Sequence, residues 1–253
     1  MIRIILFAVT ACFSITTMAQ NVLQELPFLQ KELVIYYSYD DFNKSMDFVD
    51  GSKNYLDGIP YRATTCDGYY KHGASFNDKN SYVETPDMPD VKSFTIMCWI
   101  YPKGLDEGPA AEMVYEKCMS YYMNILTVDG KSDKKRGHMR CGGKFSSADG
   151  SQTGWEYIDS PDTIPMNKWI HAACTFHNGD FKLYLDGALV AEKKIKPVLE
   201  QSNLKATWGA KQNPKINGFD GWFNGVIDES FIFSRALNAN EVKRYVDWVN
   251  ANR

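Results

Sequence analysis

The sequence predicts an all-β protein built from antiparallel strands, and three observations support this class. From Leu33 onward, short apolar runs alternate with clusters of Gly, Asn, Asp and Pro, which end strands and form turns. Two hairpin signals, Asn178-Gly179 and Asp186-Gly187, follow one another closely. No long helical pattern separates the predicted strands, so a parallel α/β fold is excluded. The 253 residues suit one large domain.

The two hairpin signals define a three-stranded meander. Residues 169–176 form an apolar first strand. Every second residue of 181–185 is Phe or Leu, which is the period of a strand with one buried face. Residues 188–191 begin the return strand. The aromatic and β-branched run 94–101 ends at Pro102 and predicts a further strand.

One helix is predicted, at the end of the chain. Asn238 and Glu241 have the spacing of a capping box, which marks the first turn of a helix. The apolar residues that follow at helical spacing are Val242, Tyr245, Val246 and Val249. We expect this stripe to dock on a sheet.

The first 19 residues are predicted to be a secretory signal peptide. Arg3 supplies its positive charge, an apolar run follows, and small residues before Gln20 suit cleavage there. Two alternatives stay open. One is an uncleaved anchor, and the other is lipidation of Cys12, which follows a lipobox-like Val-Thr-Ala.

Beyond the signal, we expect an N-terminal arm over 20–32, either a short helix or a loose segment, and a single domain over 33–253. The formal net charge is −3, so no broad basic field is present to hold nucleic acid. Only the N-terminus carries a long apolar run, which excludes a protein with several membrane spans. Because the chain begins with a predicted signal peptide, the expected location is extracellular, or periplasmic or cell-surface in a bacterium.

Five cysteines remain after the signal: Cys66, Cys98, Cys118, Cys141 and Cys174. None forms a C-x-x-C pair, so a zinc ribbon is not supported. Cys98 and Cys174 lie in apolar runs and suit burial as small hydrophobic residues. Cys118 and Cys141 flank a predicted hairpin and form the most natural disulfide pair. An odd number leaves at least one thiol free or available to another chain.

Four stretches, taken in order, resemble the laminin-G-like, concanavalin A-like jelly-roll family. They are 35–41 with 47–58, 73–84 with 93–99, 168–187 and 223–241, and they include Leu-Tyr-Leu-Asp-Gly at 183–187 and Val-Ile-Asp-Glu at 226–229. The resemblance covers about residues 33–246. It implies a jelly-roll sandwich of two antiparallel sheets, one with a shallow concave face, and it agrees with the strands and turns read from the residues.

The residues do not favour catalysis. Jelly-roll glycosidases use paired carboxyl groups on one strand, spaced E-x-D-x-x-E so that they share a face. Glu156 and Asp159 would point to opposite faces, and the adjacent pair Asp228 and Glu229 also diverges. Neither a Gly-x-Ser-x-Gly elbow nor a His-Glu-x-x-His motif is present.

The resemblance also implies a structural calcium site. In the family, the opening strand and the Ile-Asp-Glu strand meet near one rim, which would bring Asp40 and Asp41 towards Asp228. Calcium binds clustered carboxylate oxygens of this kind. The alternative is that Asp228 accepts backbone hydrogen bonds while Glu229 pairs with Arg235.

Aromatic residues in loop-like stretches suit a sugar-binding surface, because sugar rings stack their C–H faces on aromatic rings. The candidates are Tyr121, Tyr122, Trp155 and Trp222. Packing in the core or at a sheet edge is the alternative for each of them.

The sequence thus predicts a secreted, non-catalytic, lectin-like module that binds a glycan or an extracellular glycoprotein. Two other classes stay open: a polysaccharide hydrolase or lyase of the same fold, and a structural or adhesive module joined to other chains through a sheet edge or a thiol.

Overall fold

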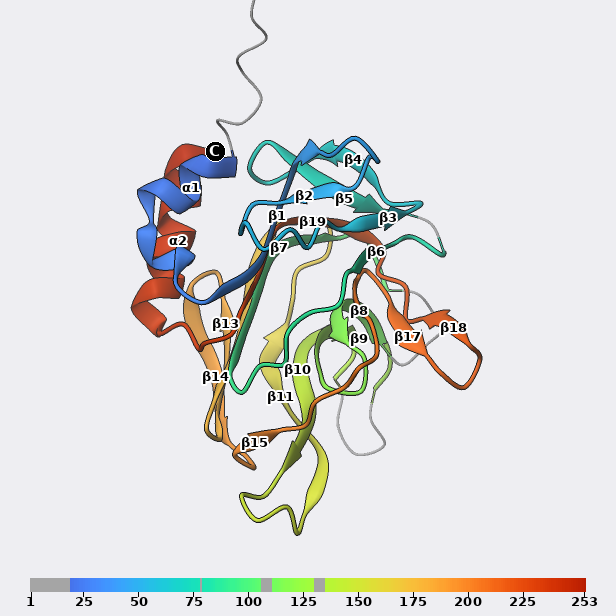
Figure 1. The fold of residues 1–253 in the computed structure, drawn as a ribbon, viewed down its shortest axis with the longest axis vertical. Helices are drawn as coiled ribbons and strands as arrows, with labels where there is room; N and C mark the ends of the chain where they lie inside the picture. The colour runs from blue at the N-terminus through green and yellow to red at the C-terminus, as the bar shows by residue number, and fades with distance from the viewer. Residues whose placement is uncertain (1–18, 78, 106–110, 130–134) are drawn as a thin grey trace, which may run out of the picture.

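Two antiparallel sheets packed face to face make up most of the molecule, and helices cover one outer face (Figure 1). The computed structural model describes residues 19–77, 79–105, 111–129 and 135–253. This architecture confirms the predicted all-β sandwich.

Sheet A comprises β1 Leu33–Phe42, β2 Phe48–Asp50, β4 Thr64–Asp67, β5 His72–Phe76, β7 Phe94–Pro102, β12 Ile170–His177, β13 Asp180–Leu185, β14 Ala188–Lys194 and β19 Gly225–Phe233. The strand order is β14-β13-β12-β7-β19-β1-β2, with β5 beside β19 and β4 beside β5.

Sheet B comprises β3 Ile59–Tyr61, β6 Tyr82–Thr85, β8 Ala111–Lys117, β9 Tyr121–Leu126, β10 His138–Ser146, β11 Thr153–Thr163, β15 Val198–Leu199 and β16 Ala206–Trp208. The strand order is β11-β10-β9-β8-β16-β6-β3, with β15 beside β10. A separate hairpin, β17 Lys211–Asn213 and β18 Gly218–Asp220, projects beside β8 (Figure 1).

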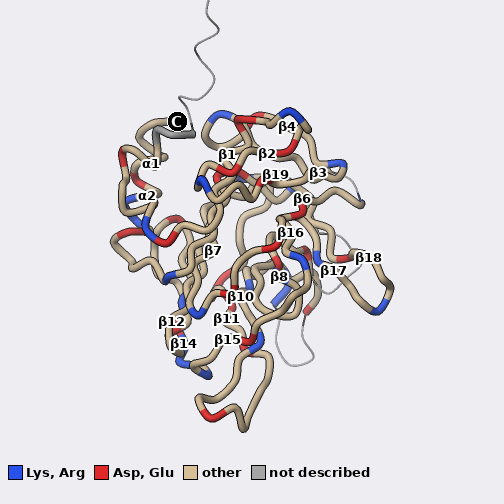
Figure 2. Tube along the Cα trace, in the orientation of Figure 1, with Lys and Arg blue, Asp and Glu red and all other residues tan. Residues whose placement is uncertain are grey.

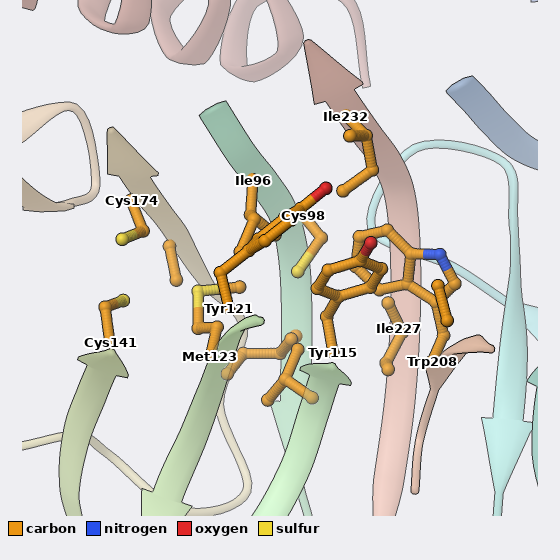
Figure 3. Close-up of a cluster of buried hydrophobic side chains, with 14 of the residues drawn as sticks. Ile96, Cys98, Tyr115, Tyr121, Met123, Cys141, Cys174, Trp208, Ile227 and Ile232 are labelled. Atoms are coloured by element: carbon orange, nitrogen blue, oxygen red, sulfur yellow. The ribbon is translucent and has the colours of Figure 1, made fainter. Parts of the chain in front are cut away.

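The inner faces of the sheets enclose one apolar core. Figure 3 shows a part of it, where Ile96 and Ile232 of sheet A lie across from Tyr121 and Met123 of sheet B. Trp208 of β16 is fully buried in the same core. Removal of these side chains from water is the main force that holds the sheets together.

Sheet A is buried on its other face as well. The C-terminal helix α2, Ala239–Asn252, begins with the predicted capping box, in which Asn238 Oδ1 accepts from the Glu241 backbone N–H at 3.0 Å. Its buried residues are the four predicted ones, and they pack against Trp99, Phe231 and neighbouring side chains of sheet A. This second contact explains why β1, β7 and β19 are buried along most of their length instead of alternating.

The N-terminal arm packs against this helix, with the Arg244 guanidinium over the Phe28 ring. Helix α1, Ala19–Glu25, and the 3₁₀ turn η1, Pro27–Gln30, bury Leu26 and Leu29 in the same cluster as α2. Arg235 fixes the arm by donating to the carbonyl oxygens of Phe28 at 2.7 Å and Lys31 at 2.9 Å. The arm is therefore a docked part of the fold.

The predicted meander is confirmed. Strands β12, β13 and β14 pair in sequence, and both connecting turns have positive φ at their two central residues. The angles are 45° and 85° at Asn178-Gly179, and 47° and 80° at Asp186-Gly187. Asn, Asp and Gly tolerate this left-handed backbone, which gives the twist that an antiparallel hairpin needs.

The predicted signal peptide, its cleavage site and Cys12 fall on residues 1–19, of which 1–18 lie outside the described residues. They therefore stay predictions. Within the described ranges, no helix combines the length and the apolar character needed to cross a bilayer. Figure 2 shows acidic and basic residues interspersed over the trace.

Candidate functional site

A pocket of about 610 Å³ opens on the outer face of sheet B. Strands β8, β9 and β11 form its floor and one side, and hairpin β17–β18 forms the opposite wall. The lining residues are Ala111, Met113, Glu116, Cys118, Met119, Tyr122, Asn124, Trp155, Lys211, Gln212, Asn213, Pro214 and Lys215. This face has no helix of the described chain against it, unlike the outer face of sheet A.

Strand alternation selects which residues reach the pocket. In β9, Tyr121, Met123 and Ile125 point into the core, so Tyr122 and Asn124 point outward. The same rule operates along the other strands of sheet B except at the bulge in β8, where the adjacent residues Val114 and Tyr115 both face the core.

The Tyr122 ring lies directly over Gly142 of the neighbouring strand β10. A Cβ atom at Gly142 would come within 2.5 Å of Tyr122 Cζ, so only glycine leaves room for the ring in this position. The register places Gly142 opposite Tyr122, which fixes this close approach. The ring is thereby held flat against the sheet as part of the pocket floor.

Trp155 of β11 continues the aromatic surface. Its side chain is 46% exposed, and its ring centroid lies 6.1 Å from that of Tyr122 at an interplanar angle of 48°. Further along β11, Tyr157 is also exposed, and the Arg140 guanidinium lies 3.7 Å from its ring centroid. Two hydrogen bonds to Asp159, of 2.6 and 2.9 Å, hold Arg140 there.

Two polar side chains of the floor have unused hydrogen-bonding capacity. Glu116 is 8% exposed and Asn124 is 6% exposed. Within the described residues, Glu116 Oε2 and Asn124 Oδ1 have no hydrogen-bond partner. A buried polar atom without a partner is costly, and a ligand hydroxyl that reached it would remove this cost.

Burial raises the pKa of Glu116 to about 8; the nearby Lys211 opposes this shift and Asp220 adds to it. At neutral pH the carboxyl group is therefore largely protonated, and it can donate one hydrogen bond and accept another.

The wall formed by hairpin β17–β18 is tied to the sheet at several points. The Met113 backbone N–H donates to Gly221 O at 2.8 Å. Across the hairpin, Lys211 pairs with Asp220 at 3.3 Å, and Asn213 Nδ2 donates to the same carboxylate at 2.6 Å. These contacts hold Lys211 and Asn213 against the pocket.

The four aromatic candidates do not all lie here. Tyr122 and Trp155 line the pocket. Tyr121 does not: it is 2% exposed and stacks on Phe94 in the core at 4.4 Å, because adjacent residues of a strand face opposite ways. Trp222 packs beside Tyr82, 6.1 Å away, and is not part of the pocket lining.

The predicted disulfide between Cys118 and Cys141 is wrong, because the two side chains lie on opposite faces of sheet B. All five described cysteines are free in this structure. Cys118 lies at the pocket, where its Sγ contacts Gln212 O at 3.3 Å, and Cys141 lies in the core. The two side chains are therefore on opposite faces of sheet B.

The calcium expectation finds no support in the geometry. Asp228 Oδ2 accepts the backbone N–H groups of Tyr69 and Tyr70 at 2.8 and 2.9 Å, as the alternative interpretation predicted. Asp40 instead holds His72, with its Oδ1 3.1 Å from Nδ1. Asp41 is not gathered with them: among the described residues, no group of three His, Cys, Asp or Glu side chains could hold a metal ion. The three carboxyl groups thus do not fit a calcium site.

The second half of that alternative is wrong. Glu229 accepts from the Tyr36 hydroxyl at 2.8 Å and from that of Tyr245 at 3.4 Å. Arg235 pairs with Glu241 at 3.0 Å, because Arg235 lies just before α2 and Glu241 lies in its first turn.

Residues 77–243 match the concanavalin A-like lectin/glucanases superfamily. The chain belongs to this superfamily. The match confirms the resemblance found in the sequence. No protein of curated function matches the chain.

Several solved structures with low sequence identity align with most of this chain. The binding domain of Paraclostridial Mosquitocidal Protein 1 aligns with a TM-score of 0.62 and 18% identity, over 87% of this chain and 53% of that one. Domain 4 of AbnA, a GH43 extracellular arabinanase from Geobacillus stearothermophilus, was solved in complex with arabinotriose. It aligns with a TM-score of 0.61 and 20% identity, over 85% of this chain and 98% of that one. The binding domain of botulinum neurotoxin DC, solved in complex with SialylT, aligns with a TM-score of 0.61 and 13% identity, over 87% of this chain and 52% of that one.

The chain thus spans about half the length of the toxin binding domains and nearly all of the arabinanase domain. At these identities the likeness shows a shared fold.

The first prediction concerns the Tyr122 ring. Gly142→Ala should lower the free energy of unfolding by roughly 1–3 kcal/mol, because the new methyl group overlaps the ring and forces it off the sheet. Gly154→Ala is the matched control, since a Cβ at Gly154 of β11 meets nothing within 4 Å. Urea unfolding measures both. Equal stabilities for the two variants would contradict the close approach.

The second prediction concerns pH. The folded state keeps the Glu116 proton up to about pH 8, whereas an unfolded glutamate loses it near pH 4.3. Stability should therefore fall as pH rises between these values. In Glu116→Gln this fall should be shallower, by at most about 1.4 kcal/mol per pH unit.

Urea unfolding of both proteins across pH 5–8 measures the difference. Asp228 and Glu229 also have pKa values raised by burial, but they are present in both proteins and cancel. Parallel pH profiles would show that Glu116 is not a buried, protonated group.

Proposed function

We propose that this protein is a non-catalytic carbohydrate-binding module that holds a sugar chain in the pocket on the outer face of sheet B. The observation that carries the proposal is the pairing of a half-exposed aromatic surface with unpartnered buried oxygens. Tyr122 and Trp155 offer rings to the apolar face of a sugar, and Glu116 and Asn124 offer hydrogen-bonding atoms to its hydroxyl groups.

The pocket suits a short stretch of sugar chain. Its volume of about 610 Å³ is in the range of small-molecule sites, and it is open to one side. The Tyr122–Trp155 pair continues along β11 towards Tyr157 and Arg140, so further sugar units would follow the strands. The ligands named for two fold relatives, arabinotriose and SialylT, give a first panel of probes.

The charges around the pocket support binding over hydrolysis. A glycosidase needs two carboxyl groups facing each other across the scissile bond. Among the described residues that line the pocket, Glu116 is the one carboxyl group. On β11, Glu156 pairs with Lys193 and Lys196, whereas Asp159 pairs with Arg140.

We also propose that the protein acts outside the cytoplasm, on a glycan or an extracellular glycoprotein. The predicted signal peptide and the binding domains among its fold relatives support this location.

The third prediction tests the aromatic surface. Trp155→Ala and Tyr122→Ala should each weaken oligosaccharide binding about tenfold or more, because each removes a ring from the centre of the site. Tyr122→Phe should retain most of the affinity, since it keeps the ring. Trp222→Ala is the matched control and should bind within about twofold of the unmodified protein.

Isothermal titration with arabinotriose, a sialylated oligosaccharide and other short glycans measures these affinities. Undiminished binding by Trp155→Ala and Tyr122→Ala would show that the sugar does not bind in this pocket. Release of reducing sugar from a polysaccharide panel, lost in Glu116→Gln, would overturn the non-catalytic assignment.

A further inference from the structure

Three fully buried cysteines lie together in the core between the sheets. Cys98 is on β7 and Cys174 on β12, both in sheet A, and Cys141 is on β10 in sheet B. The registers place Cys98 opposite Ala172 and Cys174 opposite Ile96, so these two are diagonal neighbours on one sheet. The cluster is separate from the pocket, because it lies between the two sheets, whereas the pocket opens on the outer face of sheet B.

Cys141 and Cys174 meet across the core. Figure 3 shows the two side chains directed towards each other from strands of different sheets. Both thiols are free in this structure, and burial together with the neighbouring Cys141 raises the pKa of the Cys174 thiol. A disulfide requires two Cβ vectors that point at each other over a short span, and this pair meets the requirement of direction. Cys118 does not, since it faces the pocket.

We propose that Cys141 and Cys174 form a disulfide that links the two sheets when the chain folds in the presence of a disulfide oxidant, such as oxidised glutathione or an oxidising dithiol protein. The first cysteine thiolate attacks one sulfur of the oxidant and displaces one oxidant thiolate. The second cysteine thiolate then attacks the mixed disulfide and displaces the other. The two cysteine protons pass to the two departing thiolates. The protein gains one S–S bond, and the oxidant is reduced to two thiols.

The bond forms before the sandwich closes. Both thiols are fully buried in the folded chain. Burial raises the pKa of the Cys174 thiol well above its ordinary value, and the adjacent Cys141 raises it further, so the folded protein holds almost no reactive thiolate there. During folding in an oxidising compartment, both thiols are still accessible.

Cys98 is the competing partner. It is fully buried and close enough to Cys141 to raise the pKa of the Cys98 thiol electrostatically. Its place on the same sheet as Cys174 means that either of the two sheet A cysteines would give an inter-sheet link to Cys141. The direction of the side chains in Figure 3 favours Cys174.

The fourth prediction concerns the pairing of Cys141 with Cys174. The unmodified protein is refolded in a mixture of reduced and oxidised glutathione. The protein is alkylated in denaturant without reductant, digested and mapped by mass spectrometry. We expect a linked peptide pair that contains Cys141 and Cys174, and a loss of two free thiols relative to protein refolded with reductant alone. Alkylation of both residues in the oxidised sample would overturn the proposal, as would a link from Cys141 to Cys98.

Two variants serve as controls. Cys118→Ala and Cys98→Ala should both keep the linked peptide, because neither cysteine belongs to the pair. Cys174→Ala should lose it. The map of the unmodified protein decides the pairing even where a core variant fails to fold. Protein folded first in reductant and then exposed to oxidised glutathione should remain unlinked, and rapid linking there would contradict oxidation before closure.

Discussion

Burial of one face of sheet B against sheet A is the constraint on which the rest of the structure depends. Because successive residues of a strand point to opposite faces, this single contact sorts the side chains of β9 to β11, and those of β8 on either side of its bulge. Tyr121, Met123 and Cys141 face the core, whereas Tyr122, Asn124 and Gly142 face outward. A shift of one residue in the register of β9 would place Asn124 in the core and remove the floor of the pocket.

The two sheets differ in what covers their outer faces. Helix α2 and the N-terminal arm cover the central strands of sheet A on their outer face, which stabilises the domain. The outer face of sheet B has a glycine, two rings and two buried polar groups, which together form a surface that is apolar in one part and hydrogen-bonding in another. Under the proposed function, the surface that binds the sugar and the surface that carries the helices belong to different sheets.

Local chemistry made much of the fold predictable. The Asn-Gly and Asp-Gly turns gave the meander, and the capping box at Asn238 gave the final helix, because each depends on residues close in the chain. Alternation alone also separates Tyr121 from Tyr122, and applying it to β9 would have removed Tyr121 from the predicted site. Glu116 and Gly142 could not be identified in this way. No residues close in the sequence mark Glu116 or Gly142 as parts of a site. The pocket exists only because tertiary pairing brings β10, β11 and the β17–β18 hairpin together. The Cys118–Cys141 pairing failed for the same reason, since spacing along the chain does not report the face of the sheet.

The most direct test of the account is to map a bound oligosaccharide by NMR on isotope-labelled protein. We expect saturable shifts that are largest at Tyr122, Asn124, Gly142 and the Trp155 indole, with little change at Trp222 or in sheet A. Shifts concentrated around Asp40 and Asp228, or no saturable shifts with any glycan tested, would contradict it.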